Sequence, residues 1–413
     1  MSRFLPYSPE QAYLLPPSVK DVLPEGHLCF FLQGVIAKLD LSLFAEAYSL
    51  EGGELYAPEM MLSVWLYAYA TGLTSGRRLE RKIVEDLPLR YLAGGQHPDH
   101  WALSAFRRRH RRGMNDVFTQ VLELVRDAKL GRLGTVAVDS TPIKADSGRG
   151  RVDSRKRLRR DRARYRRQIR RWQQQCEQAE TEEAAAYAAK QLERWQRQLA
   201  SCPARLQQLK KSGEKKLPRT DGEARVLHKR GKSVIGYTAE IVASEDHFIV
   251  GERVSQQKAD NAAVVPMVEE VQRQCGEKPG KVLADAGYFS GKNLEQLRDQ
   301  GIEAYIPDSN LAKELNTGKR ARGIGGEPVR NPEIKAMRKK LRSAEGRQTY
   351  ERRKSIVEPV FGTLKAQRDM SRFRLRSLAK VGIEFTLACI AYNVTRWRQQ
   401  QCKSKLRDKP DRV

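Results

Sequence analysis

The sequence lacks the cysteine, histidine and glycine patterns that mark several common kinds of site. Its six cysteines include no CxxC pair, which favours buried or incidental thiols in a reducing cytoplasm over disulfides or zinc. No GxGxxG or GxxxxGK loop is present, so nucleotide hydrolysis is not indicated. No HxxxH or HExxH spacing occurs either, so we assign none of the six histidines to a metal: His27, His97, His100, His110, His228 and His247.

Long apolar runs are also missing. The strongest ones, Leu28–Ile36 and Phe385–Ile390, are well short of the roughly 20 residues that cross a bilayer. Residues 1–17 lack the basic stretch and apolar core of a secretory signal peptide. With 40% hydrophobic residues, the 413-residue chain still has enough apolar material for two or three folded domains. We therefore expect a cytoplasmic globular protein that does not enter a membrane.

Charge is distributed unevenly along the chain. Residues 1–130 contain 15 basic and 15 acidic side chains, so the net charge of +27 comes entirely from later residues. Arg149–Trp172 alone contains 13 basic residues against Asp153 and Asp161. Such a surface favours a polyanion, and nucleic acid gains affinity there by releasing its counterions. An anionic membrane surface or a merely solubilising tract is the alternative.

Residues 1–130 are expected to be helical. Proline, glycine and capping residues divide them into four helices: Glu59–Thr71 beginning at Pro58, one after Ser75, the basic Ala105–Arg112 capped by Ser104, and Asn115–Leu130. Short helices with a basic one among them are compatible with a helix-turn-helix-like DNA-binding module, although a generic helical bundle fits nearly as well. On the basic helix, Arg107, Arg108 and Arg109 are candidate DNA contacts.

From residue 131 the periodicity changes to that of an α/β domain. Short apolar runs predict strands at Thr135–Val138, Ser233–Val242, Phe248–Val254, Lys281–Ala284 and Ala304–Ile306. Helices are predicted at Ala262–Arg273, after Ser290, near Thr349–Gln367 and at Val381–Gln400. Residues 308–347 are basic and contain glycines, so we expect them to be loose.

Residues 148–230 interrupt this pattern with a long helical excursion. Apolar residues recur there at +4/+3 spacing in two registers: Tyr165, Ile169, Trp172 and Cys176, then Leu192, Trp195, Leu199 and Cys202. Because the registers do not join, we expect a helical hairpin or a stuttered coiled coil that ends at Pro203 and Pro218. Its basic residues Arg155, Arg157 and Arg160 are candidate DNA contacts.

Three carboxylates stand out by their context. Asp139 ends the first predicted strand in Val-Asp-Ser-Thr, Asp285 ends another in Ala-Asp-Ala-Gly-Tyr, and Glu358 lies in Val-Glu-Pro-Val-Phe-Gly. A carboxylate after a buried strand costs free energy unless a cation or donors satisfy it. Each one alone is more simply a helix cap or an ion-pair partner. Together at one edge of a sheet, they suit two hard divalent ions that hold the attacking and leaving oxygens of a phosphodiester.

On these motifs the chain resembles the DDE transposases of bacterial insertion sequences, in the branch whose glutamate helix carries a Tyr…Arg/Lys…Glu…Lys signature. The resemblance implies an RNase-H-like α/β catalytic domain with a mixed sheet, two Mg²⁺ or Mn²⁺ ions, and cutting and joining of transposon ends. The domains would be residues 1–130 for the DNA-binding module, 131–147 and 231–400 for the catalytic domain, 148–230 for the basic helical insertion, and 401–413 for a basic tail.

The resemblance also implies roles for single residues. Asp139, Asp285 and Glu358 would be the catalytic metal ligands, and Lys365 occupies the family's Glu-x6-Lys position. Glu358 and Lys365 are seven residues apart, so they share a helix face about 10 Å apart along the axis. Pro359 disfavours helical geometry at Glu358, so the helix either kinks or begins there.

The remaining signature positions fit less well. The family places Tyr seven residues and Arg four residues before the glutamate, whereas Tyr350 lies eight before it and Lys354 lies four before it. Tyr350, together with Arg353 or Lys354, is the expected DNA-contacting set.

The sequence therefore predicts a bacterial, nucleoid-associated DNA transposase whose partners are double-stranded terminal inverted repeats and target DNA, and which forms a homodimer on DNA. A metal-dependent, structure-specific nuclease on the same fold is the alternative. A non-catalytic DNA-binding relative is a third reading, against which the complete Asp/Asp/Glu set argues.

Overall fold

The computed structural model describes residues 18–46, 55–148, 150–229, 232–257, 263–318 and 331–407. The chain divides into two compact units, which are described separately. Unit 1 comprises Met1–Leu130 and Leu387–Val413, and unit 2 comprises Gly131–Thr386. One long helix, α16 (Leu378–Arg407), begins in unit 2 and continues into unit 1.

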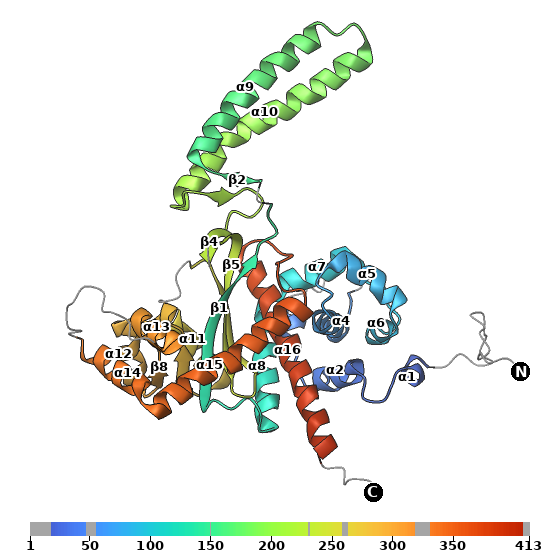
Figure 1. Cartoon of the computed structure of the whole chain (residues 1–413). Coiled ribbons are helices and arrows are strands. Elements are labelled where there is room, and N and C mark those ends of the chain that lie inside the picture. The colour runs from blue at the N-terminus through green and yellow to red at the C-terminus, as the bar shows by residue number, and fades with distance from the viewer. Residues whose placement is uncertain are drawn as a thin grey trace, which may run out of the picture. The chain divides into compact units, whose positions relative to one another are not determined.

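Unit 1 is helical throughout its described part (Figure 1). In addition to the C-terminal part of α16, its helices are α1 (Val19–Val22), α2 (Leu28–Ile36), α3 (Ser42–Ala45), α4 (Pro58–Ala70), α5 (Gly76–Glu85), α6 (Leu87–Leu92), α7 (His100–Arg109) and α8 (Arg111–Asp127). Pro58 is at the first helical position of α4, as predicted, because its missing N–H has no helical partner there anyway. The apolar residues of α4 from Met61 to Tyr69 are buried and form the centre of this unit.

The predicted start of the basic helix is wrong. Helix α7 begins at His100, and Asp99 caps it by accepting a hydrogen bond from the Ala102 N–H at 2.7 Å. Ser104 therefore lies inside the helix and does not cap it. Both Asp99 and Ser104 are good N-cap residues, so residue type alone could not choose between them.

Unit 2 is built on a six-stranded mixed sheet. Its strands are β1 (Thr135–Lys144), β4 (Arg225–Lys229), β5 (Lys232–Ser244), β6 (Ile249–Ser255), β7 (Lys281–Ala284) and β8 (Glu303–Tyr305). They lie in the order β4-β5-β1-β7-β8, with β6 also paired to β5. Strand β1 is antiparallel to β5 and parallel to β7, which is parallel to β8. Val136–Val138 of β1 and Val282–Ala284 of β7 are fully buried, which explains their continuous apolar runs.

The helices of unit 2 cover both faces of this sheet. They are α11 (Val264–Cys275), α12 (Gly291–Asp299), α13 (Ser309–Thr317), α14 (Pro332–Arg342) and α15 (Ala344–Gly362), with a short 3₁₀ turn η1 (Ala286–Tyr288) and a π-helical segment η2 (Thr363–Gln367). Helix α15 packs against β1, β5, β7 and β8, and α11 packs against β5 and β6. Gly251 of β6 allows the approach of α11, because a Cβ there would lie 2.9 Å from Val271 Cγ2.

The expectation that residues 308–347 are loose is wrong for their described part. Asp308 caps α13 and Asn331 caps α14, each accepting hydrogen bonds from backbone N–H groups of the first turn. Leu311, Met337 and Leu341 are buried on these helices. Their apolar residues are too few for a clear periodicity, and the charge of the segment hid the signal. Residues 319–330 of this stretch lie outside the described ranges.

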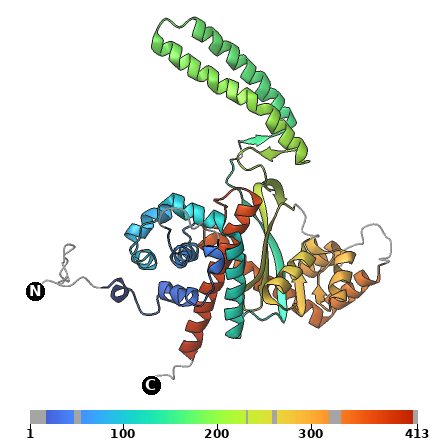
Figure 2. The same cartoon turned by 180° about the vertical axis from the view of Figure 1, so that it is seen from behind.

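The excursion in unit 2 is a helical hairpin. Helices α9 (Arg155–Glu177) and α10 (Glu182–Lys211) run side by side, as Figure 1 and the reverse view in Figure 2 both show. A small two-stranded sheet of β2 (Val152–Asp153) and β3 (Leu217–Pro218) joins their ends. The prediction that Pro203 ends the helix is wrong, because Pro203 lies inside α10. Continuous packing on α9 holds that helix together across the proline.

Helix α16 contains the most apolar long segment of the described residues. Within Leu378–Lys403, an 18-residue window has a mean hydropathy of 1.2, which by length and composition alone would allow the helix to cross a membrane. Since 72% of that window is buried inside the structure, its apolar character is explained by core packing.

Candidate active site

Asp139 lies in the middle of β1 and does not end the strand as predicted. The strand continues to Lys144 because residues 136–144 stay paired with β5. Asp139 pairs with Ile241, its side chain is half-buried, and its Oδ1 accepts a hydrogen bond from the Ser140 N–H at 2.8 Å. Side chains alternate along a strand, so Asp139 and Thr141 point to the same face of the sheet.

Asp285 lies beside Asp139 on the neighbouring strand. Strand β7 ends at Ala284, as predicted, and Ala284 pairs in parallel with Val138. The residues that follow this pair, Asp285 after Ala284 and Asp139 after Val138, are therefore at adjacent positions. Asp285 is half-buried, and its Oδ1 accepts a hydrogen bond from the Gly287 N–H at 2.9 Å, which caps the turn η1. Two carboxylates thus lie at adjacent positions, Asp139 within β1 and Asp285 directly after the end of β7.

Glu358 belongs to helix α15, which packs on the same sheet. The helix neither ends nor begins at Pro359, which lies within it. Ile356, Val357 and Val360 are buried and hold the helix against the strands on both sides of the proline. The Glu358 side chain itself is exposed.

Lys365 connects the end of this helix to the aspartate strand. It lies in the π-helical segment η2, a distortion that is often found at functional sites. Its Nζ donates hydrogen bonds to Thr141 Oγ1 and, at 3.4 Å, to the Pro142 carbonyl. Because Thr141 shares a face with Asp139, the Lys365 ammonium lies on the aspartate side of the sheet.

Tyr350 and Arg353 lie about one turn apart on α15, and Arg353 is buried while Tyr350 is half-buried. Arg353 is only 8% exposed, and its guanidinium carbon lies 6.0 Å from the Tyr350 ring centroid. Burial raises the pKa of the Tyr350 hydroxyl, the charge of Arg353 opposes this, and that of Asp285 adds to it. Lys354 is exposed, so Arg353 is the residue of the two that lies beside the tyrosine.

The donor set of the three carboxylates fits a hard divalent cation, since all of its ligand atoms are oxygens. Asp139 and Asp285 are already neighbours, and Glu358 extends from the helix that packs on their sheet. Within the described ranges, no group of three or more His, Cys, Asp and Glu side chains lies close enough to hold an ion.

The three arginines predicted on the basic helix of unit 1 have different environments. Arg107 is only 3% exposed; its guanidinium stacks 4.3 Å from the Trp65 ring centroid and donates to Tyr69 Oη at 2.6 Å. This arginine packs in the core of unit 1, so of the three predicted contacts Arg108 and Arg109 are the ones with exposed side chains. In the sequence, Leu103 and Phe106 lie four and one residues before Arg107, on the same helix face, and this spacing indicates that Arg107 faces the core.

The hairpin has a strongly basic surface. Helix α9 contains eleven lysines and arginines against Asp161 and Glu177. Arg155 and Arg160 are exposed and Arg157 is half-buried. The apolar seam between the helices contains Tyr165 and Trp195, whose ring centroids are 5.7 Å apart. The predicted apolar registers thus face each other, and the arginines are left to solvent.

An ion-pair network anchors the root of the hairpin. Asp153 is 4% exposed and accepts hydrogen bonds from Arg205 at 2.6 and 2.7 Å and from Arg219 at 2.7 Å. Arg219 also donates to Asp161 at 2.6 Å. Burial would raise the pKa of Asp153, but the hydrogen bonds from Arg205 and Arg219 outweigh it and hold the pKa below its usual value.

Replacing Asp153 with Asn is expected to destabilise the hairpin root by about 3 kcal/mol at neutral pH, because it leaves two part-buried arginines poorly paired. Since the folded pKa is lowered, the stabilisation is fully present above the unfolded pKa of about 4 and is lost as pH falls below it. Hydrogen exchange of α9 amides at pH 6 and pH 3.5 measures the local stability of the hairpin. The difference in amide protection between wild type and Asp153→Asn should shrink at the lower pH.

Glu193→Gln is the control for that experiment. Glu193 forms an exposed pair with Arg197 at 3.2 Å on the same hairpin, and such pairs contribute little. A pH-independent difference between wild type and Asp153→Asn would contradict the network's role.

Comparison with known families agrees with this geometry. Residues 130–394 match the family described as Transposase DDE domain, and residues 17–109 match the one described as Transposase domain (DUF772). No curated protein and no solved structure matches the chain. The first match covers more than half of the sequence and contains β1, β7 and α15 with their three carboxylates. The chain therefore belongs to the DDE transposases of insertion-sequence type.

Proposed function

We propose that the protein cleaves the ends of its insertion sequence and joins them to target DNA in a Mg²⁺-dependent reaction, with Asp139, Asp285 and Glu358 as the metal ligands. The observation that carries the proposal is the register of β1 and β7, which makes Asp139 and Asp285 neighbours on the sheet that α15 covers. The mixed sheet with these aspartates on its central strands supports an RNase-H-like assignment of the catalytic domain.

Each residue of the site has a separate task in this proposal. Asp139, Asp285 and Glu358 hold the cations, which when bound supply charge stabilisation at the attacking and leaving oxygens of the phosphodiester. Lys365 binds a phosphate oxygen of the DNA beside Asp139 with its ammonium, which is a compact point charge. Tyr350 and Arg353, which lie together on α15, hold the DNA strand that approaches the carboxylates. The exposed Arg108 and Arg109 contact DNA from unit 1.

Incubation with Mg²⁺ and DNA that carries the element's own terminal inverted repeats tests the proposal. Cleavage at the repeat ends, followed by strand transfer into a target plasmid, is the expected result. Cleavage without strand transfer would favour a structure-specific nuclease, and binding without cleavage a non-catalytic relative. Sedimentation of the DNA complex tests the homodimer that we propose for the assembled state.

Lys365→Ala is expected to slow end cleavage about 10- to 100-fold, because it removes a charged phosphate contact. Lys365→Arg should keep much of the rate, since a second cation can meet the same phosphate. Single-turnover cleavage at saturating Mg²⁺ measures the rates of both variants. In a separate Mg²⁺ titration, the concentration that gives the half-maximal rate should hardly change. Lys335→Ala on the exposed face of α14 is the control. Wild-type cleavage by Lys365→Ala at low salt would remove Lys365 from the site.

A further inference from the structure

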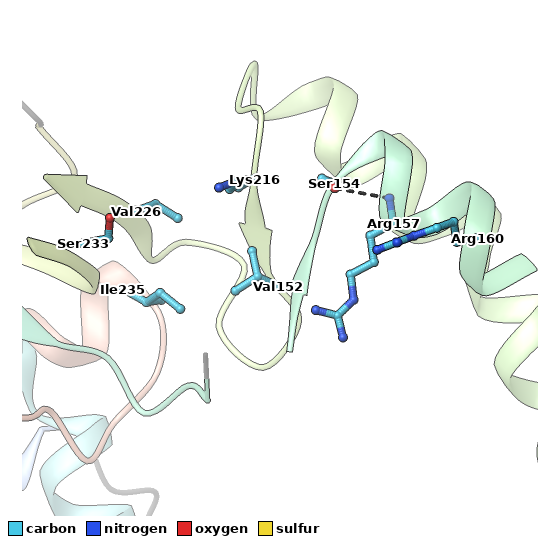
Figure 3. Close-up of a pocket in the computed structure, with 8 residues that line it drawn as sticks. All are labelled: Val152, Ser154, Arg157, Arg160, Lys216, Val226, Ser233 and Ile235. Atoms are coloured by element: carbon cyan, nitrogen blue, oxygen red, sulfur yellow. Dashed lines mark hydrogen bonds between the residues drawn. The ribbon is translucent and has the colours of Figure 1, made fainter. Parts of the chain in front are cut away.

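A cavity of about 810 Å³ lies in unit 2 between the root of the hairpin and the β4–β5 end of the sheet. We call it the root pocket, and it is lined by Val152, Ser154, Arg157, Arg160, Lys216, Val226, Ser233 and Ile235. Figure 3 shows Val226, Ser233 and Ile235 on the strand side, Arg157 and Arg160 on the helix side, and Val152 between them. The lining therefore comes from three separate segments of the chain.

The root pocket carries uncompensated positive charge. Three of its lining residues are cations and none is a carboxylate. Arg157 already has partners within the protein: its Nη2 donates a hydrogen bond to the Gly150 carbonyl at 2.6 Å, and its Nε lies 4.0 Å from Asp161 Oδ2. Within the described part of the chain, Arg160 and Lys216 have neither an ion-pair partner nor a hydrogen-bonded side chain. An anion is the ligand that this charge favours.

The other half of the lining is apolar. Val152, Val226 and Ile235 present aliphatic side chains to the same cavity as the cations. A free inorganic anion would gain nothing from these contacts. A nucleic-acid backbone combines a charged phosphate with the apolar carbons of its sugar, so it matches both halves. The pocket is open and large enough for one or two such units.

We propose that the root pocket is a fixed phosphate subsite for the backbone of the DNA that the active site cleaves. This inference rests on the proposed function, because it takes DNA as the substrate. A basic hairpin would attract DNA at many positions, whereas the root pocket would bind one particular phosphate of the backbone.

The strand register gives the distance between this subsite and the active site. Ile235 lines the pocket, and Ile241, six residues further along β5, pairs with Asp139. Six residues of β-strand span about 20 Å. One DNA strand advances about 3.4 Å along the duplex axis per nucleotide. In a duplex that runs along β5, the bound phosphate therefore lies about six nucleotides from the cleaved bond.

The first test measures affinity with the full-length protein and a 30-base-pair duplex of random sequence. The pocket variant is Arg160→Gln with Lys216→Gln, and the matched control is Arg166→Gln with Arg167→Gln, two exposed arginines of the same helix. Both variants lose two positive charges from the surface. We expect the pocket variant to lose at least about fivefold more affinity than the control, because its two cations line one pocket and can meet the same phosphate in charge-assisted hydrogen bonds. The charge-keeping variant Arg160→Lys with Lys216→Arg should bind like wild type.

The second test locates the phosphate. Single methylphosphonates, which are uncharged, are placed at each position within 12 nucleotides of the cleavage site on the element's end. Wild type and the control variant should show a loss of affinity, about tenfold, at about six nucleotides from the cleaved bond. In the pocket variant that loss should disappear, since the partner cations are already gone.

Three outcomes would overturn the proposal. The first is equal affinity of the pocket and control variants for random DNA, and the second is the lack of any methylphosphonate position whose effect depends on the pocket. The third comes from a parallel assay with an oligoglutamate peptide: the pocket variant loses peptide binding while its DNA binding is unchanged. The last would assign the pocket to an acidic protein. Failure of the proposed function is distinguishable, because a chain that does not cut the element's ends still gives a clear result in the random-duplex experiment.

Discussion

Asp139→Asn is expected to reduce cleavage of the element's ends by at least about 10³-fold while leaving DNA binding nearly intact. An amide has nearly the same shape as a carboxylate, but it is neutral and binds Mg²⁺ poorly. Asp139 lies beside Asp285 in register, so one substitution leaves an incomplete ligand set at the centre of the sheet. Asp285→Asn and Glu358→Gln should have effects of the same order for the same reason.

Two measurements separate this prediction from loss of folding. Mn²⁺ binding in the presence of end DNA, followed by electron paramagnetic resonance, should weaken in all three variants while the circular dichroism spectrum stays unchanged. Asp146→Asn is the control, since Asp146 follows β1 but pairs with Arg376 at 2.7 Å on the surface. Cleavage by Asp285→Asn at the wild-type rate with Mg²⁺ would show that the ligand assignment is wrong.

The central strands could be predicted because they are buried on both faces. Such strands need apolar residues at nearly every position, so the strand predicted at Lys281–Ala284 has the same bounds as β7. The predicted end of β1 was wrong, because only its first half is continuously buried. After Val138 the strand carries Asp139, Ser140 and Thr141, whose polar side chains resemble a loop. Pairing with β5 keeps these residues extended, and pairing with a distant strand is invisible to local periodicity.

The remaining errors have the same physical origin. Pro203 would break an isolated helix, yet it lies inside α10, which tertiary packing holds together. Pro359 likewise lies inside α15, which excludes a helix start there. Arg107 looked like its neighbours in the sequence, and only the ring of Trp65 above it distinguishes a core arginine from a surface one. No local pattern distinguishes Lys216 from the other lysines near the end of the hairpin, because the root pocket forms only when β4 and β5 are in place.

Neutralising six hairpin arginines to Gln is expected to weaken DNA binding by two to three orders of magnitude at about 0.1 M salt. The six are exposed residues of α9 outside the root pocket: Arg159, Arg162, Arg166, Arg167, Arg170 and Arg171. Because the apolar seam with α10 occupies the other face of the helix, these side chains face solvent without a layer of base-reading residues among them. Phosphate contacts carry no sequence information, so element ends and random duplexes should be affected alike.

Salt titration gives the sharper measurement. The slope of log affinity against log salt should flatten by about 0.9 for each arginine that meets a phosphate. A variant that loses six exposed lysines elsewhere has the same net charge and serves as control: Lys38, Lys278, Lys292, Lys313, Lys335 and Lys339. If the two variants changed the slope equally, only net charge would be involved. A loss confined to the element's own ends would instead mean that the hairpin reads sequence, and contact with the backbone alone would no longer explain its charge.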